Sequence, residues 1–190
     1  MKTTSNLSVL FVANNSNYLS LDCDCWTISR NALNFKASKP ALYHPPCASW
    51  SRMRHFSKFV PGRHWLALWS LVRVRRYGGI IEHPFGSLFF KRYIVTPGSG
   101  YDKYGGFTIL TDLHSFGAPY EKKTLLYFVG LKISELPSLP LNFDAITHCV
   151  DTSSSSSVLK VIPKDQRSIT PLSMCEWLLS ALSIIVNNKS

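Results

Sequence analysis

The stretch Ala41-Leu42-Tyr43-His44-Pro45-Pro46-Cys47 decides the expected fold, because a short apolar run ends there abruptly in a loop that holds a cysteine. A strand that ends in a loop carrying reactive side chains is a common arrangement in α/β proteins. Two other stretches have the same form. Val9 to Ala13 ends in the polar cluster 14–17, and Gly79 to Ile81 ends in Glu82-His83-Pro84. The pattern predicts an α/β fold whose strands end in polar loops.

The remaining elements follow from periodicity and from turn residues. A helix is predicted for residues 61–77, ended by the pair Gly78-Gly79. The stretch from Thr124 to Leu131 is rich in β-branched and aromatic residues and predicts the strongest strand, whereas the glycine-rich residues 95–106 predict a loop. Thr170-Pro171 opens a final amphipathic helix. The apolar positions at helical spacing in the first helix are Trp65, Leu68, Trp69 and Val72.

The chain of 190 residues predicts one domain overall. Residues 1–150 are expected to form the α/β core, residues 151–166 a serine-rich linker, and residues 167–190 a helix that packs back on the core. Leu21 to Trp26 fits no single element. Ser29 to Leu33 predicts the start of a short helix.

The chain is strongly basic, and this bears on its partners. Lys and Arg total 21 against 11 Asp and Glu, which gives a formal net charge of +10. Such a charge attracts polyanions over a long range, so nucleic acid is the first partner to expect. The alternative, that the charge serves only solubility, stays open on composition alone.

The cysteines and the apolar stretches indicate a compartment. Five cysteines are an odd number in a chain of ordinary domain size, so a disulfide scaffold is not expected. No apolar stretch reaches the roughly 18 residues that a membrane span needs, and the run from Leu7 to Ala13 leads into polar residues rather than a cleavage site. We therefore expect a reduced, cytoplasmic protein without a membrane partner.

Three motifs occur in a meaningful order along the chain. They are Pro45-Pro46-Cys47, Glu82-His83-Pro84, and the segment from Phe116 to Lys123 that runs into Leu125 to Gly130. The order resembles that of the cytosine-5 DNA methyltransferase family, over roughly residues 40–186. In that family Pro-Pro-Cys follows one strand, Glu-Asn follows another, and a Tyr-Gly-x-Pro segment leads basic residues into a third. The resemblance implies a reduced Rossmann-like methyltransferase sheet with helices on both faces.

The chemistry of that family explains why these residue types occur together. Carbon 5 of cytosine is too weak a nucleophile to accept a methyl group directly, so a thiolate first adds to carbon 6. The resemblance assigns this role to Cys47. A glutamate bonded to ring nitrogen 3 favours protonation of the ring, and a raised pKa suits this task. The resemblance assigns it to Glu82, and the segment between the two is long enough for a loop, a helix and a strand.

The resemblance also implies contacts to DNA, whose target base must be flipped out of the duplex. Lys122 or Lys123 matches an arginine that grips the cytosine, and Thr124 lies near a position that is often arginine. The loop after the cysteine would close over the DNA and hold its phosphates; the alternative is that its basic residues are simply solvated. The candidate substrate-binding residues of this loop are Ser49, Ser51, Arg52 and Arg54, with His55 and Lys58 beside them.

The cofactor half matches the family least. The family binds S-adenosylmethionine with a glycine-rich turn after its first strand, and glycine permits the close backbone approach that a nucleotide needs. Residues 13–17 contain no glycine, and few residues separate them from Cys47, so part of this half is trimmed. The recognition segment before the last helix is also short. The candidate cofactor-binding residues are Ala13, Asn14, Ser16, Asp22, Asp24 and Pro45.

Several alternatives remain at this point. Cys47 can be an inert packing residue, and Glu82 can cap a strand or pair with an arginine. The residues Cys23, Cys25, His44 and Cys47 have the right types for zinc, although their spacing is poor. A zinc deaminase requires Pro-Cys-x-x-Cys, and position 50 is Trp.

The function itself has three versions. The first is a compact DNA cytosine-5 methyltransferase that uses S-adenosylmethionine. The second is a cofactor-less descendant that binds DNA or a partner enzyme, for example to modulate a nuclease, and it rests on the missing glycine turn and the net charge of +10. The third is a base-modifying enzyme that keeps Cys47 and Glu82 but uses another donor.

Overall fold

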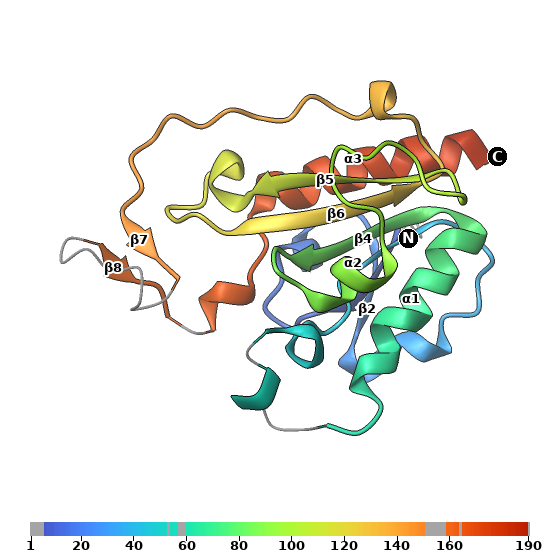
Figure 1. Ribbon diagram of the computed structural model, residues 1–190, viewed down its shortest axis with the longest axis horizontal. Helices are drawn as coiled ribbons and strands as arrows, with labels where there is room; N and C mark the ends of the chain where they lie inside the picture. Colours follow the sequence, from blue (N-terminus) through green and yellow to red (C-terminus); the bar gives the residue numbers. More distant parts are fainter. Residues whose placement is uncertain (1–5, 53, 57–59, 151–158, 164, 190) are drawn as a thin grey trace.

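The computed structural model describes residues 6–52, 54–56, 60–150, 159–163 and 165–189. Its main strands are β1 (Ser8–Val12), β2 (Asp24–Thr27), β3 (Ala41–Tyr43), β4 (Gly79–Pro84), β5 (Gly106–Asp112) and β6 (Lys123–Val129). They form one six-stranded sheet in the order β2-β1-β3-β4-β6-β5 (Figure 1). The strands β1 to β4 pair in parallel, whereas β6 is antiparallel to both β4 and β5. The sheet is therefore mixed.

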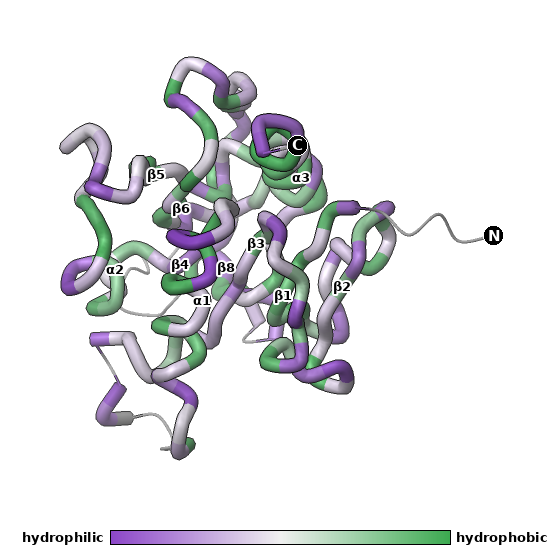
Figure 2. Tube along the Cα trace, turned by 90° about the vertical axis from the view of Figure 1, so that its right-hand side faces the viewer, coloured by the Kyte–Doolittle hydropathy of each residue, from purple (hydrophilic) through white to green (hydrophobic). Residues whose placement is uncertain are grey.

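Helices cover both faces of this sheet. They are α1 (Arg63–Tyr77), α2 (Leu88–Tyr93) and α3 (Leu172–Lys189). Because successive side chains of a strand point to opposite faces, Ile80 packs in the core with α3 and Ile81 packs in the core with α1 and α2. In Figure 2, α3 lies on one side of the strands and α2 on the other. The predicted α/β fold with helices on both faces is confirmed at this level.

Helix α1 starts two residues later than predicted. Gly62 precedes it with φ +77, and Gly78 ends it with φ +85, a conformation that glycine adopts without strain. The predicted apolar stripe is not the buried one, since Trp65 and Val72 are exposed while Ala67 and Leu71 are buried. The buried stripe consists of small and branched residues because the helix lies close against the sheet.

Helix α3 begins at Leu172, just after the predicted start signal, and fills the other face. Its buried residues are Met174, Cys175, Trp177, Leu178, Leu179, Ala181, Leu182 and Ile185. By length and composition alone, the segment 166–189 is apolar enough to cross a membrane. The prediction that no stretch meets this criterion was therefore wrong. A helix that fills a protein core passes the same test, and here one face of α3 packs on the sheet.

Several short elements differ from the sequence predictions. The ambiguous stretch before residue 27 contains β2, and the predicted helix near residue 30 is instead two 3-10 helices, Ile28–Arg30 and Ala32–Asn34. Residues 95–105 form a loop as predicted, but β5 begins at Gly106 and pairs with β6. Helix α2 was not predicted. The side chain of Ser87 accepts a hydrogen bond from the backbone N–H of Phe89 and caps it.

The predicted linker is only partly described, since residues 151–158 and 164 lie outside the described residues. The remainder includes β8 (Lys160–Val161), which pairs in parallel with β7 (His148–Cys149). This small pair lies to the side of the main sheet (Figure 1). The segment 159–163 therefore contains a short strand and not only linker.

Gly79 allows β3 and β4 to approach closely. Its φ is +129, and an added Cβ would collide with the backbone of Ala41. We expect Gly79→Ala to lower the free energy of unfolding by about 3 kcal/mol in urea denaturation, because strain and collision add. Gly98→Ala is the control, since Gly98 has φ +81 but open space around it. It should cost only about 1 kcal/mol. Equal losses for the two variants would contradict this role of Gly79.

Candidate active site

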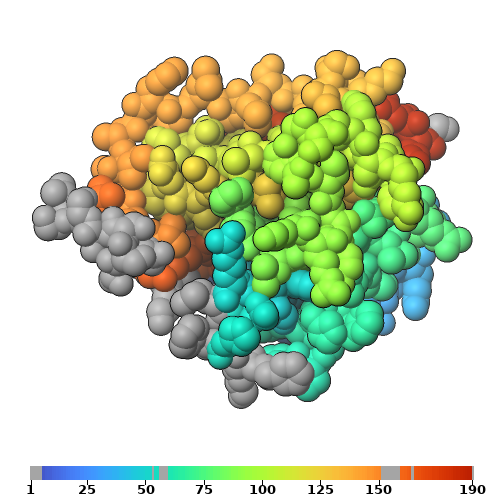
Figure 3. All heavy atoms as spheres, in the orientation of Figure 1, coloured from blue at the N-terminus to red at the C-terminus, as the bar shows by residue number. Residues whose placement is uncertain are grey.

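The parallel pairing of β3 with β4 brings two chain segments to the same edge of the sheet. Leu42 pairs with Ile80 and Tyr43 pairs with Ile81, so the chain leaves β3 beside the last residues of β4. Figure 3 shows the residues around position 50 against residues 84–95 on one face of the molecule. Cys47 and Glu82 therefore lie at one edge.

Cys47 lies at the start of the 3-10 helix Ala48–Trp50, and its side chain is exposed to solvent. Its carbonyl oxygen accepts a hydrogen bond from the backbone N–H of Trp50 at 2.9 Å, which fixes the turn. Loss of hydration of the sulfur among the surrounding protein atoms raises the pKa of Cys47, and so does the negative charge of Glu82. The positive charges of Lys122 and Arg63 act to lower it. Cys47 is thus an accessible thiol whose ionisation depends on charges from three other segments.

Glu82 is held by a histidine that stands next to the Pro-Pro-Cys motif. Nδ1 of His44 lies 3.0 Å from Oε2 of Glu82, and Nε2 of His44 lies 3.1 Å from the hydroxyl of the buried Tyr18. Burial alone would raise the pKa of Glu82, but the hydrogen bond and charge of His44, followed by the charge of Lys122, bring it below its usual value. The expectation of a raised pKa for Glu82 was wrong, because His44 reaches it from another strand, a contact that the spacing of the motifs does not indicate.

His83 points to the other face of β4 from Glu82. It is fully buried and packs against Phe89 and Phe90, and burial lowers its pKa to about 4. Its Nδ1 lies 2.7 Å from Oγ of Ser87, while its Nε2 has no hydrogen-bond partner among the described residues. His83 is therefore neutral at physiological pH and keeps one ring nitrogen available.

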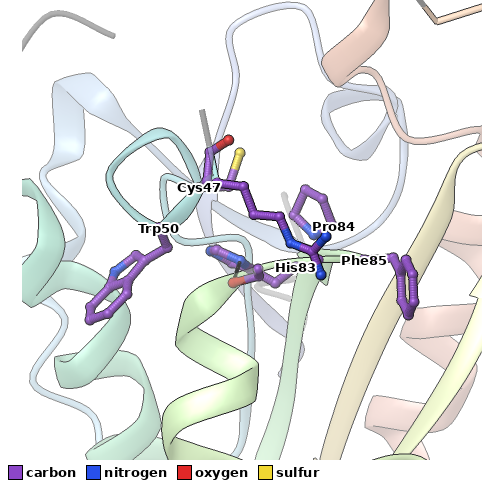
Figure 4. Close-up of a pocket in the computed structure, with 9 residues that line it drawn as sticks. Cys47, Trp50, His83, Pro84 and Phe85 are labelled. Carbon is purple, nitrogen blue, oxygen red and sulfur yellow. Dashed lines mark hydrogen bonds between the residues drawn. The ribbon is translucent and has the colours of Figure 1, made fainter. Parts of the chain in front are cut away.

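A pocket of about 270 Å³ opens beside Cys47 on the His83 side of β4 (Figure 4). Trp50 and Arg52 reach it from the loop after β3, and Pro84 and Phe85 reach it from the end of β4. Glu82 does not line this pocket, since its side chain is bonded to His44 on the face of β4 opposite His83. Cys47 therefore stands between a carboxylate on one side and a small pocket on the other.

The structure distinguishes the two candidate lysines. Lys122 is half-buried and acts electrostatically on both Cys47 and Glu82, and its Nζ donates to the carbonyl oxygen of Arg167 at 2.6 Å. Lys123, by contrast, is exposed at the start of β6. Thr124 is fully buried, and its hydroxyl donates to the carbonyl oxygen of Lys122 at 3.3 Å. Lys122 is therefore the lysine whose charge acts on the site.

The loop after Cys47 contributes only some of its predicted residues. Ser51 and Arg52 line the pocket beside Cys47, whereas Ser49 does not. Arg54 is exposed in the 3-10 helix Arg54–Phe56. Lys58 lies outside the described residues.

The predicted cofactor residues are not gathered at one place. Asp24 lies at the start of β2, opposite the edge that holds Cys47, where it pairs with Arg30 at 2.5 Å and accepts a hydrogen bond from Trp26. Asp22 is exposed before β2, and Ser16 caps the 3-10 helix Asn17–Ser20. The other three lie at strand ends: Ala13 and Asn14 are exposed after β1, and Pro45 is buried after β3.

A second pocket, of about 240 Å³, lies between the ends of β1 and β2 and the start of α1. Phe11 and Trp26 form its aromatic walls, and Arg63 is the charged residue that lines it. Phe11 and Asn31, the described non-glycine residues with positive φ, both line this pocket. Strained backbone of this kind is concentrated at functional sites in proteins. None of the six predicted cofactor residues lines this pocket.

The described residues do not assemble the alternative zinc set. No group of three or more His, Cys, Asp or Glu side chains among them is placed to hold a metal ion. Cys23 and Cys25 lie with their sulfur atoms 3.5 Å apart, whereas His44 is bonded to Glu82 and Tyr18. All five cysteines are free thiols.

Sequence reasoning missed three residues of the site. His44 was considered only as a zinc ligand, although its place beside Pro45 was a signal for a role next to Cys47. His83 was treated only as a replacement after Glu82. Tyr18 had no signal in the sequence, because its contact with His44 joins segments that are distant along the chain.

Comparison with protein-family models found no family that matches the chain, and comparison with curated proteins found no matching relative.

The opposing charges around Cys47 predict how its reactivity changes with pH. Glu82→Gln removes a negative charge, so the pKa of Cys47 should fall and its alkylation by iodoacetamide should start at lower pH. Lys122→Met should move the alkylation profile to higher pH. The readout is mass spectrometry of the peptide that contains Cys47. Lys123→Met is the control and should leave the profile unchanged. Profiles that do not move in opposite directions for Glu82→Gln and Lys122→Met would contradict this geometry.

Proposed function

We propose that the protein is a cysteine-dependent, cytosine-modifying enzyme that acts on DNA, related in chemistry to cytosine-5 DNA methyltransferases. The observation that carries the proposal is the position of Cys47 and Glu82 at the ends of adjacent parallel strands, with the charge of Lys122 acting on both. An accessible thiol next to a held carboxylate suits addition to a ring whose nitrogen must be protonated at the same time.

The proposed chemistry begins with the Cys47 thiolate. Its sulfur adds to carbon 6 of cytosine, the ring electrons move toward nitrogen 3, and that nitrogen takes up a proton beside Glu82. Carbon 5 then has enamine character and reacts with an electrophile, of which a proton from water is the simplest. Lys122 favours the thiolate through its positive charge. Loss of the proton from carbon 5 and departure of the thiolate restore the ring.

The topology supports this proposal. From β1 the chain passes to β2 on one side and then returns to β3 on the other, so the connection direction changes between β1 and β3. Open α/β sheets bind ligands at the carboxyl ends of the strands at such a point. The aromatic pocket that includes Phe11 and Pro46 lies there, and Cys47 follows directly. We propose on this ground that the sheet is a reduced Rossmann-like methyltransferase sheet.

The charge distribution supports DNA as the substrate. Arg52 and Arg54 are exposed on the loop that carries Cys47, and the whole chain has a formal net charge of +10. Basic side chains near a base-modifying site hold the phosphates that flank an extruded nucleotide. Stacked bases in a duplex are out of reach of a side chain in a loop, so single-stranded or flipped cytosine is the proposed form.

The pocket at this position is a poor match to S-adenosylmethionine, the expected methyl donor. Its aromatic walls suit an adenine ring, but none of its lining residues is acidic, so no carboxylate is available for the ribose hydroxyls. The charged residue there is Arg63, which disfavours a sulfonium cation. Its volume of about 240 Å³ also lies below the range of roughly 300–1,000 Å³ for cofactor pockets. The residues do not fit the group, and we derive no transfer step through it.

A second candidate is a protein that binds DNA or a partner enzyme without catalysis. The same mismatch favours it, together with the raised pKa of Cys47, since a protonated thiol is a poor nucleophile. The two candidates differ in one respect that does not involve a donor. An enzyme that adds a thiolate to carbon 6 activates carbon 5, whereas a binding protein leaves the base unchanged.

Exchange at carbon 5 therefore tests the proposal without a cofactor. We expect the protein to replace deuterium by hydrogen in single-stranded DNA containing 5-deuterocytosine, measured by mass spectrometry of the nucleosides. Cys47→Ala should slow this exchange by at least about a thousandfold, as loss of a covalent nucleophile does elsewhere.

The control for this assay is Cys149→Ala, which removes a thiol on the β7–β8 pair and should leave exchange intact. DNA affinity is measured in parallel by fluorescence anisotropy. Absence of exchange in the folded wild-type protein with retained DNA affinity would reject the enzyme and favour the binding protein. Equal exchange by wild type and Cys47→Ala would reject Cys47 as the nucleophile.

A further inference from the structure

We propose that His44, held by Tyr18, is a positioning residue and proton reservoir for Glu82, so that the three side chains act as a relay toward ring nitrogen 3 of the base. The inference rests on the proposed function and identifies where its proton comes from. It assigns roles to His44 and Tyr18, two residues that belong to none of the three motifs.

The geometry is a continuous chain of three side chains from three elements. Glu82 comes from β4, His44 follows β3, and Tyr18 comes from the 3-10 helix Asn17–Ser20 after β1. The two hydrogen-bond distances are 3.0 Å between Glu82 and His44 and 3.1 Å between His44 and Tyr18. Only one carboxylate oxygen, Oε2, is used in the described contact, so Oε1 of Glu82 remains for a substrate.

The chemistry of the partners fixes which atom carries the proton. A carboxylate accepts hydrogen bonds, so Nδ1 of His44 must be the donor to Glu82. Nε2 of His44 then faces the hydroxyl of Tyr18, which can accept a bond from N–H or donate one to a bare nitrogen. Tyr18 therefore supports His44 in either charge state. A partner that could only donate would exclude the imidazolium.

A reservoir is needed because Glu82 itself is a poor proton source. His44 and Lys122 bring its pKa below the usual value despite its burial, so Glu82 is a carboxylate at neutral pH. Histidine is the residue type whose charge ordinarily changes near neutral pH. A proton on Nδ1 of His44, passed through Glu82, supplies what ring nitrogen 3 requires.

The step balances without a further reactant. As the bond forms between the sulfur of Cys47 and carbon 6, the π electrons move from the carbon 5–carbon 6 bond to the carbon 4–carbon 5 bond, and a pair moves onto nitrogen 3. The carboxylate of Glu82 first takes the proton from Nδ1 of His44 on Oε2, and the resulting carboxyl group then turns and gives that proton to nitrogen 3. His44 ends neutral, with its Nε2–H donating to Tyr18. When the thiolate leaves, the electrons and the proton return by the same route.

Other titratable groups also act on this relay, and the test must separate them. Cys47 lies on the same loop as His44, and His83 lies next to Glu82 on β4, where its charge interacts with both Glu82 and His44. Lys122 acts from the loop before β6. On the far side, Cys175 of α3 and Cys23 act on Tyr18. Of these, His83 titrates with a pKa of about 4 and Tyr18 well above the usual value, so neither changes charge near neutral pH.

The pH profile of the deuterium exchange tests the relay. Wild type should give a bell-shaped profile, because the ascending limb requires the thiolate of Cys47 and the descending limb requires a proton held on the relay. His44→Asn keeps a hydrogen-bond donor at the position of Nδ1 but cannot titrate. It should lose the descending limb and reduce the maximal rate by about a hundredfold. His148→Asn, on β7 away from the site, is the matched control and should keep the wild-type profile.

Tyr18→Phe is the second variant, and it keeps the buried ring while removing the hydroxyl that accepts from the imidazolium. It should move the descending limb to lower pH, with alkylation of Cys47 unchanged. Wild-type profiles in both folded variants would overturn the relay and leave the proposed function intact. A loss of rate in His44→Asn with an unchanged bell shape would also overturn it, since a purely structural role changes the rate alone. Absence of exchange in wild type would instead reject the proposed function.

Discussion

The close approach of β3 and β4 at Ala41 and Gly79 determines the positions of Cys47 and Glu82. The missing side chain of Gly79 lets the two backbones pair in parallel, and the register then places Tyr43 beside Ile81. The chain segments that follow Tyr43 and Ile81 therefore lie at the same edge of the sheet. This is why Cys47, in a loop, and Glu82, in a strand, lie there together. A shift of one residue in this register would turn Glu82 to the face of α1 and α2 and His83 to the face of α3.

The alternation along β4 also divides the site into two halves with different properties. On the α3 face, Glu82 is held by His44 and Tyr18, and after burial its charge is the next cause that raises the pKa of Cys47. On the other face, neutral His83 lines a small pocket with Trp50. Cys47 is exposed between these halves, so a base that reaches the thiol meets both. In the proposed function, proton supply therefore lies on one face of the sheet and space for a ligand on the other.

The sequence predicted those elements whose signals are local. Val9 to Val12, Ala41 to Tyr43 and the strand after Lys122 are buried apolar runs, and the glycines at 78 and 79 mark the end of α1. It did not predict α2, a single short helix that depends on the cap from Ser87, nor β2, whose residues are only half-buried. The stripe of α1 was misjudged because the sheet selects small residues such as Ala67 over Trp65, and periodicity alone does not rank them.

For the site, motifs gave residue types but not their partners. The Pro-Pro-Cys and Glu-His-Pro segments identified Cys47 and Glu82, and the structure selected Lys122 over Lys123 by its position. The pKa of Glu82 was predicted in the wrong direction because His44 reaches it only across two paired strands. Asp24 was a candidate cofactor-binding residue, yet parallel pairing with Ser8 puts it at the edge of the sheet opposite Cys47. The pairing of the strands determines which distant segments come into contact and at which edge of the sheet a residue lies. The spacing of residues along the chain does not reveal this pairing.

The central claim is that the thiol of Cys47 becomes bonded to a cytosine ring while Glu82 faces it. The most direct measurement is peptide mapping by mass spectrometry after incubation with single-stranded DNA that contains 5-azacytosine, whose ring stays activated toward thiolates. We expect a nucleoside adduct on the peptide containing Cys47 and on no other cysteine peptide, with less adduct in Glu82→Gln. An adduct on another cysteine, or none on the folded wild-type protein, would contradict it.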